Sequence, residues 1–269
     1  MKKAFAGLAL TAALGVISAP VLAGPVSVGN IMFANNGGHI ETTTLAEQFI
    51  NPVTDPTGSG WGYGVVSTID GASSYCASGT CQLYYTAHFQ NAAFSGVGNS
   101  IISFGAVEVT LYYHSGAEIN LMNANSPANL AMIQSWTQYA VLDQHGPQVA
   151  TGSLTGGTLT LDGAGLLDIN EVLSGNAAFA KALDTNTVPD GKGGWADVAY
   201  TESANNFFLN PNDVSGGFAG GCATGAAATG AWCWQGSLNT RGTVPEPAPL
   251  ALVSLGLLGI AALRRRKNS

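Results

Sequence analysis

The sequence predicts a mainly β protein: a single antiparallel β-sandwich or barrel-like domain with short helices. Apolar and polar residues alternate in many short segments, such as VEVTLYY from Val107 to Tyr113. A period of two is the pattern of a half-buried strand. Turn chemistry separates these segments, in runs such as NNGG, DPTGSG and PDGKGG. Many short strands with Gly- and Asn-rich turns between them are typical of a sandwich or barrel.

The first 23 residues have the three parts of a secretory signal peptide. The cations Lys2 and Lys3 precede an apolar run, and the triplet VLA ending at Ala23 fits the small-residue cleavage rule. We therefore expect cleavage between Ala23 and Gly24. An uncleaved membrane helix is the alternative, and Pro20 together with the cleavage triplet argues against it. The protein is predicted to be exported.

Residues 24–243 are long enough for one domain with a substantial core. The alternation and the turn signals predict these strands: Val26–Phe33, Tyr63–Ile69, Leu83–Phe89, Val107–Tyr113, Trp136–Leu142, Gln148–Leu154, Thr158–Leu161, Trp195–Thr201 and Phe207–Leu209. A turn is expected at the HGP run that begins with His145. Short helices of two turns each are predicted at Thr43–Phe49 and Ala177–Leu183.

This domain is strongly acidic. The whole chain has 9 Lys and Arg against 16 Asp and Glu. Most of the cations lie near the termini, so residues 24–243 hold 15 acids and only 3 bases, Lys181, Lys192 and Arg241, for a net charge of about −12. Such a surface has no basic footprint for phosphates. The composition therefore excludes nucleic acid as a partner.

The four cysteines form two pairs that are close in sequence, Cys76 with Cys81 and Cys222 with Cys233. In an oxidising compartment an even count indicates disulfides. Three connectivities are open to four cysteines, and we expect the two local pairs. Neither pair has the Cys-x2-Cys spacing typical of zinc.

No familiar catalytic motif occurs in the chain: there is no Gly-x-Ser-x-Gly elbow, His-Glu-x-x-His helix or phosphate loop. The histidines, His39, His88, His114 and His145, are dispersed. His88 is expected on the outward face of its strand, His114 at a strand end and His145 in a turn. We therefore predict no catalytic residue and no enzymatic activity, with a triad assembled only in space as the alternative.

Two acidic loops are the candidates for a metal site. They contain Asp184, Asn186, Asp190 and Gly191, and Asp162, Asp168, Asn170 and Glu171. Oxygen ligands at close spacing suit calcium. However, neither loop follows the spacing of a calcium-binding loop, and Asp and Asn are ordinary turn formers. The prediction is no metal site and no cofactor, with calcium as the alternative.

Aromatic residues near glycines suggest a second kind of site. Trp61 and Tyr63 lie among glycines, and Trp232 and Trp234 flank Cys233. Flat rings of this kind bind sugars when they are exposed, but they also fill the cores of β-sandwiches. Core filling is the preferred interpretation.

Residues 244–269 contain three consecutive parts. These are the motif Pro245, Glu246 and Pro247, the apolar run Leu250–Leu263, and the cations Arg264, Arg265, Arg266 and Lys267. This arrangement resembles the PEP-CTERM sorting signal of Gram-negative bacteria. The resemblance implies recognition and removal of the tail by an exosortase-type membrane protease. The hydrophobic helix would be a transient inner-membrane tether, with its cations on the cytoplasmic side. A plain C-terminal anchor is the alternative, although the run is shorter than the roughly 20 residues that cross a bilayer.

Several segments also resemble exported PEP-CTERM proteins associated with flocculation. They are GWGYGVV, LYYTAHF, VEVTLYYHSGAEINL and GGWADVAYTES. The resemblance implies a role at the cell surface or in the extracellular matrix, where the protein would aid aggregation, floc or biofilm formation through exopolysaccharide.

Three classes of function follow from these observations. The first is a non-enzymatic surface or matrix protein. The second is a carbohydrate-binding module, which requires an exposed row of aromatic rings. The third is a secreted hydrolase, for which Glu108 and Glu118 are the conceivable acids.

Overall fold

The structure is a computed structural model that describes residues 25–34, 37–47, 57–95, 101–119, 121, 126–155, 158–205 and 234–243. The chain divides into two compact units, and the described residues belong to the unit Pro25–Pro245. The other unit consists of Met1–Gly24 and Glu246–Ser269 and lies outside the described residues. The described unit is mainly β, as predicted.

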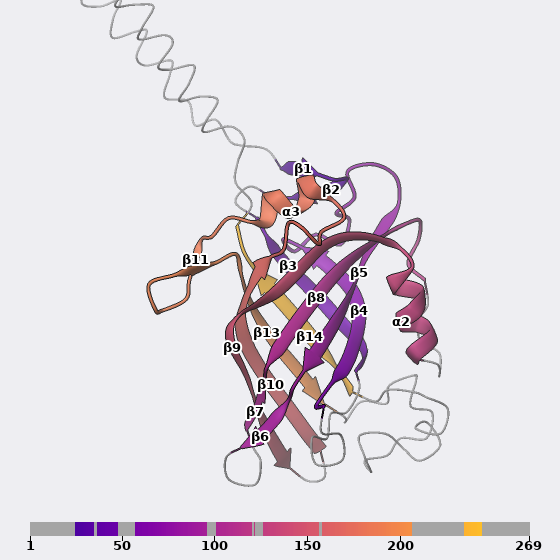
Figure 1. Ribbon diagram of the computed structural model, residues 1–269. Coiled ribbons are helices and arrows are strands. Elements are labelled where there is room, and N and C mark those ends of the chain that lie inside the picture. The colour runs from indigo at the N-terminus through magenta and orange to yellow at the C-terminus, as the bar shows by residue number, and fades with distance from the viewer. Residues whose placement is uncertain are drawn as a thin grey trace, which may run out of the picture. The chain divides into compact units, whose positions relative to one another are not determined.

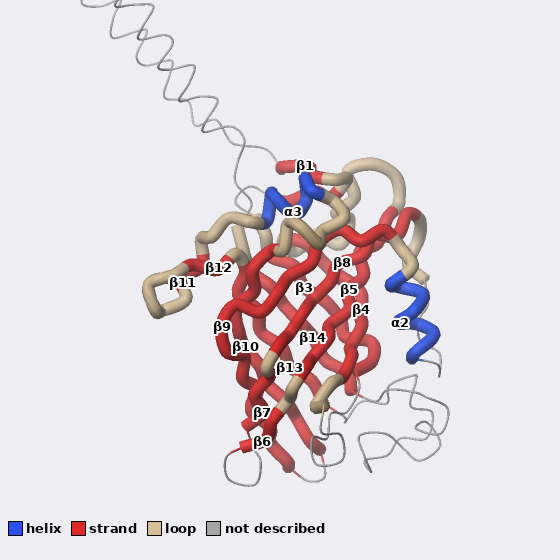
Figure 2. The backbone as a smooth tube through the Cα atoms, viewed as in Figure 1, coloured by secondary structure: helices blue, strands red, loops and turns tan. Residues whose placement is uncertain are grey.

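Eight antiparallel strands form a closed barrel (Figures 1 and 2). They follow the order β10-β13-β14-β3-β4-β5-β8-β9, and β9 pairs back with β10. Their bounds are β3 His39–Glu47, β4 Gly60–Ile69, β5 Cys81–Gln90, β8 Ala106–Ser115, β9 Thr137–Thr155, β10 Thr158–Ile169, β13 Val198–Asn205 and β14 Trp234–Arg241. The short strands β6 (Ala93–Ser95) and β7 (Ile101–Phe104) continue the sheet beside β9. Of the two predicted architectures, the protein adopts the barrel.

The remaining described elements pack around the barrel (Figure 1). The hairpin β1 (Val26–Val28) and β2 (Ile31–Phe33) lies with helix α3 (Ala177–Leu183) at one end. Helix α2 (Ser126–Gln134) lies beside the outer wall, and the small hairpin β11 (Val188–Pro189) and β12 (Trp195–Ala196) projects to one side. The bounds of α3 are the predicted ones.

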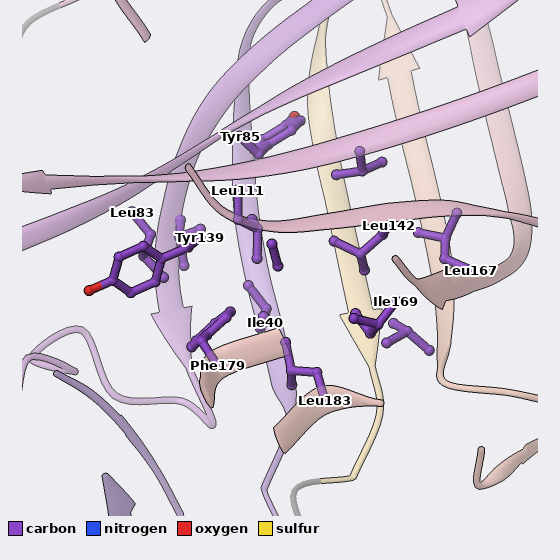
Figure 3. Packing of buried hydrophobic residues seen from close by; sticks show 14 of the residues in the cluster. Ile40, Leu83, Tyr85, Leu111, Tyr139, Leu142, Leu167, Ile169, Phe179 and Leu183 are labelled. Carbon is purple, nitrogen blue, oxygen red and sulfur yellow. The ribbon is translucent and has the colours of Figure 1, made fainter. Parts of the chain in front are cut away.

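Apolar side chains fill the end of the barrel that α3 covers. Figure 3 shows Phe179 and Leu183 of α3 beside inward-facing residues of the strands, among them Ile40, Leu142 and Ile169. The cavity that remains here, lined by Leu183 and by strand residues, measures about 20 Å³. That volume holds about one water molecule, so this end of the interior is packed.

A second apolar cluster lies outside the barrel wall. Tyr63, Tyr84 and Tyr112 point outward from β4, β5 and β8 and are buried with Ile133 of α2. Asn129 of α2 donates a hydrogen bond of 2.8 Å to the Tyr63 hydroxyl. The helix therefore shields an aromatic face that would otherwise be open to water, and Tyr63 fills a core as the sequence indicates.

Carboxylates that accept several backbone hydrogen bonds tie loops to the barrel. Asp197 is 2% exposed, and it accepts backbone N–H bonds from Ile169 at 2.8 Å and from Thr185 and Asn186 at 2.7 Å. Asp70 likewise accepts three backbone N–H bonds. Part of the acidity of the domain is thus structural.

The predicted helix at Thr43–Phe49 is wrong. Residues 43–47 belong to β3, and Phe49 lies outside the described residues. Thr42 and Thr44 face inward while Thr43 is exposed, which is the period of a strand. Backbone pairing with β4 and β14 on either side overrides the local preference of this segment.

Several predicted strand boundaries also differ, and β10 extends the predicted strand Thr158–Leu161 to Ile169. Val26–Phe33 is a hairpin, because Gly29 and Asn30 have φ values of 56° and 70°, which suit a two-residue turn. The two strands at 136–142 and 148–154 are one strand, β9, so the expected turn at His145 is wrong: Gly146 at φ 72° accommodates a bulge instead. Trp195–Thr201 is divided between β12 and β13. The predicted strand Phe207–Leu209 lies outside the described residues.

Candidate functional site

A row of five side chains crosses the outer face of the barrel at one level. The registers pair Trp61 of β4 with His88 of β5, His88 with Glu108 of β8, Glu108 with Asp143 of β9, and Asp143 with Asp168 of β10. Directly opposed residues on neighbouring strands have Cβ atoms about 4.5–5.5 Å apart. We call these five residues the outer row. All of them except Asp143 are candidate residues on sequence grounds alone.

Two flat rings occupy one end of the outer row. The Trp61 and His88 rings stack with their centroids 4.0 Å apart and an interplanar angle of 5°. His88 Nε2 lies 3.2 Å from Ser59 Oγ, and its Nδ1 lies 3.2 Å from Gln90 Nε2. Burial lowers the pKa of His88, against the opposing effect of Glu108. His88 is therefore a neutral, fixed ring at pH 7.

Three carboxylates occupy the rest of the outer row. Glu108, Asp143 and Asp168 stand on adjacent strands, and like charges in direct opposition destabilise a sheet. Each has a polar neighbour: Thr110 Oγ1 lies 3.5 Å from Glu108, Asn170 Nδ2 donates to Asp143 at 2.7 Å, and His145 lies 2.7 Å from Asp168. An arrangement that costs stability and is nevertheless held in place is characteristic of a functional surface.

His145 joins the acidic end of the outer row to the projecting hairpin. Its Nδ1 lies 2.7 Å from Asp168 Oδ2, and its Nε2 lies 3.5 Å from Asp190 Oδ2. The hydrogen bond to Asp168 is the largest of the effects that raise the pKa of His145, and Asp190 adds to it. Asp190 also accepts backbone bonds from Lys192 at 2.7 Å and Gly194 at 2.8 Å, and these lower its own pKa.

The remaining histidines lie elsewhere. His39 Nε2 is 3.8 Å from Glu41 Oε1. His114 lies near the end of β8, as expected, and its ring packs against Trp136 with centroids 4.8 Å apart. His88 faces outward, as expected. Glu118, the second conceivable acid, affects the pKa of Tyr84 and Tyr75 rather than any residue of the outer row.

The two acidic loops form turns. Asn186 Nδ2 donates to Asp184 at 3.0 Å, and Asn170 Oδ1 accepts the Leu173 N–H at 3.0 Å. Asp162 is exposed, whereas Asp168 belongs to the outer row. Within the described ranges, no group of three or more His, Cys, Asp or Glu side chains is arranged to hold a metal ion.

Some of the other predicted sites lie among the described residues, and the rest lie outside them. Cys76 and Cys81 form a disulfide, as expected for that pair. Cys222, Cys233 and Trp232 lie outside the described residues, as do the cleavage site Ala23–Gly24 and the C-terminal signal. Trp234 is the first residue of β14. In the part of the chain that the structure describes, no helix has the length and apolar character needed to cross a membrane.

Two features escaped the sequence reasoning. Asp143 has no motif around it, and only the pairing of β8 with β9 and β10 places it between Glu108 and Asp168. Sequence reasoning also did not single out the buried acids Glu47 and Glu202, since neither lies in a catalytic motif. The alternation of β13 places Glu202 on the same face as buried Tyr200, a signal that was readable in principle.

The family model of the PEP-CTERM protein-sorting motif matches residues 243–267. The match covers the motif Pro245–Pro247, the apolar run and the basic cluster. No curated protein and no solved structure gives a match to the chain. The chain therefore carries a PEP-CTERM sorting signal, which makes it an exported protein that is sorted by exosortase, a membrane protease, through a transient membrane anchor.

Proposed function

We propose that the exported barrel is a non-enzymatic protein of the cell surface or extracellular matrix that binds exopolysaccharide and thereby aids aggregation of cells. The outer row is the proposed binding surface. The observation that carries the proposal is the stacked pair Trp61 and His88 beside the carboxylates of Glu108 and Asp143. The flocculation resemblance of these same strands supports it.

The chemistry of the outer row suits a sugar chain. An aromatic face packs against the C–H groups of a pyranose ring, and carboxylates accept hydrogen bonds from neighbouring hydroxyls. Three carboxylates in the row repel uronic acids, so neutral or amino sugars are the expected ligands. Neutral His88 adds a ring without adding charge.

The test is binding of the purified full-length chain to exopolysaccharide from its own host, measured by co-sedimentation. Trp61→Ala removes the ring platform and is expected to weaken binding at least about tenfold, since stacking on an aromatic ring contributes roughly 1–3 kcal/mol. Trp195→Ala controls for the loss of an exposed indole ring, because Trp195 is 54% exposed on β12 and lies outside the outer row, whereas Trp61 is partly buried. Equal binding by wild type and Trp61→Ala would refute the site.

The same preparations test the non-enzymatic part of the proposal. Wild-type protein incubated with the exopolysaccharide is expected to release no reducing ends. Turnover that disappears in Glu108→Gln would instead make the protein a hydrolase with a catalytic acid in the outer row.

A further inference from the structure

A second polar group lies inside the barrel, beyond the apolar end that α3 covers. It consists of Glu47 on β3, Tyr85 on β5, Gln148 on β9, and Tyr200 and Glu202 on β13. We call these five residues the interior cluster. Near one end of β3 and β13, Ile40 and Val198 line the small cavity under Leu183 of α3. Glu47 and Glu202 lie toward the other end of the same two strands.

The strand registers bring the two acids and the amide to one layer of the interior. Glu202 is paired with Gly163 of β10, and Gly163 is paired with Ala150 of β9, two residues from Gln148. Glu47 belongs to β3, which lies on the other side of β13 from β9 in the strand order. It is paired with Gly62 of β4. Burial raises the pKa of Glu47, and the carboxyl group of Glu202 raises it further.

Glycines on two strands make room for these side chains. A Cβ atom on Gly62 would lie 3.3 Å from Glu47 Cγ, and one on Gly64 would lie 2.6 Å from Tyr85 Cε1. On β10, a Cβ atom on Gly165 would lie 2.7 Å from Tyr200 Cε1. Polar side chains thus occupy space that larger residues on β4 and β10 would fill. The interior of the barrel is polar here because of a specific glycine pattern.

Two acceptor atoms of the interior cluster have no hydrogen-bond partner. Glu47 Oε2 and Gln148 Oε1 are buried and unpaired, and their residues are 8% and 1% exposed. An unpaired buried acceptor costs about 1–3 kcal/mol. The three cations among the described residues, Lys181, Lys192 and Arg241, are all exposed, so none of them compensates the two interior acids. The interior cluster therefore combines buried oxygen acceptors with two acids that no described Lys or Arg neutralises.

We propose that the interior cluster is a binding site for a hard divalent cation of the size of calcium. The carboxylates of Glu47 and Glu202 and the amide oxygen of Gln148 would be its protein ligands. The donor set contains only oxygen, which selects calcium or magnesium over softer metals. Calcium is favoured of the two, because it accepts irregular coordination from few charged ligands, whereas magnesium demands an octahedron.

Protons compete with the cation for this site. Burial raises the pKa of Glu202 to about 7 and that of Glu47 well above its ordinary value. The other titratable groups that face the two acids are Tyr85 and Tyr200, and burial raises the pKa of both, so they stay neutral. Burial favours the neutral form of both carboxyl groups, and a metal ligand must lose its proton, so calcium binding should strengthen as the pH rises from 5 to 8.

The test is a calcium titration of the full-length chain at pH 8 in 0.3 M NaCl, which screens exposed carboxylates. We expect one calcium ion per chain by equilibrium dialysis at pH 8 and none at pH 5. At a calcium concentration about a hundred times Kd, Tm should rise by roughly 5–10 °C. Magnesium at the same concentration should give less than half of that shift.

Two variants and a control locate the ion. Glu47→Gln and Glu202→Gln keep the shape of each side chain and should abolish both the bound ion and the Tm shift. Asp162→Asn is the control, because it removes one exposed carboxylate next to Gly163 on the outside of the same strand. No bound calcium in the wild type at pH 8, or an ion that both Gln variants retain, would overturn the proposal, and dialysis of the wild type decides it even if a variant fails to fold.

Discussion

Tyr75 joins two strands where their direct pairing ends. The pairing of β4 with β5 runs from Gly60 to Val65, and beyond it the Tyr75 hydroxyl accepts the Leu83 N–H at 3.0 Å and donates to the Val66 carbonyl at 3.1 Å. Burial raises the pKa of Tyr75 to about 12, so the hydroxyl keeps its proton. Cys76, the residue that follows Tyr75, forms the disulfide with Cys81 at the start of β5.

Tyr75→Phe is expected to destabilise the protein by about 1–3 kcal/mol, because the buried Leu83 N–H loses its partner. The measurement is the free energy of unfolding in guanidinium chloride. Tyr113→Phe is the control: the Tyr113 hydroxyl accepts only a half-buried bond from Asn30, at 3.0 Å, and its loss should cost less than about 1 kcal/mol. Equal stabilities of the two variants would show that the Tyr75 bridge is unimportant.

The sequence predicts the structural roles of some single residues well and of others not at all. Cys76 and Cys81 are predictable because a short turn between two exported cysteines leaves few alternatives. Tyr75 is not, because its function depends on a gap between two strands that no local pattern encodes. The same holds for Asp143, whose neighbours in the outer row come from strands distant in sequence.

Glycine spacing along β4 and β10 sets the shape of the barrel interior. Gly64→Ala should destabilise the protein by about 1–3 kcal/mol, because the new Cβ atom would lie 2.1 Å from the Thr43 carbonyl oxygen, which is fixed in β3. Gly163→Ala is the control, since its Cβ atom meets nothing closer than 3.5 Å. Thermal unfolding of both variants makes the comparison, and a Gly64→Ala variant as stable as Gly163→Ala would contradict the packing described here.

The hairpin of β11 and β12 is attached to the barrel through His145. The pKa of His145 is raised in the folded protein. The stabilisation that His145 gives to this attachment is therefore complete below pH 6.5 and is lost as the pH rises through the folded pKa. Hydrogen exchange of residues 188–196, corrected for intrinsic rates, should therefore show more protection at pH 6 than at pH 8. His145→Gln should remove this dependence.

His39→Gln is the control for that experiment. His39 Nε2 lies 3.8 Å from Glu41 Oε1, whereas the ion pair to the hairpin residue Asp190 comes from His145. The variant should keep the difference between pH 6 and pH 8. If His145→Gln keeps it too, the attachment of the hairpin does not depend on the imidazolium.

Elements with a strong local pattern are predictable, and those set by pairing are not. The alternation in β5 and β8 and the apolar spacing of α3 are visible in the sequence. β3 contains Leu45, Ala46 and Glu47, which favour a helix locally, but it lies between two long strands that supply its hydrogen bonds. β9 crosses His145–Gly146–Pro147 because a bulge absorbs the turn chemistry.

For the whole molecule, sorting comes from the C-terminal signal and the proposed binding from the barrel. The sorting motif at residues 243–267 is recognisable because a protease must read it as a linear sequence. The outer row is a property of the closed sheet, so the sequence shows its members without showing that they are neighbours. This is why sequence reasoning finds the destination of the protein more readily than its ligand.

The most direct test of the account is the mass of the protein recovered outside the cell. We predict that the extracellular form begins at Gly24, lacks the apolar run Leu250–Leu263 and the basic cluster, and contains the Cys76–Cys81 disulfide. Replacing Pro245, Glu246 and Pro247 with Ala should leave export intact and hold the protein in the membrane with its tail attached. Wild-type protein outside the cytoplasm that still ends at Ser269 would contradict removal of the tail and would make the C-terminus a plain anchor.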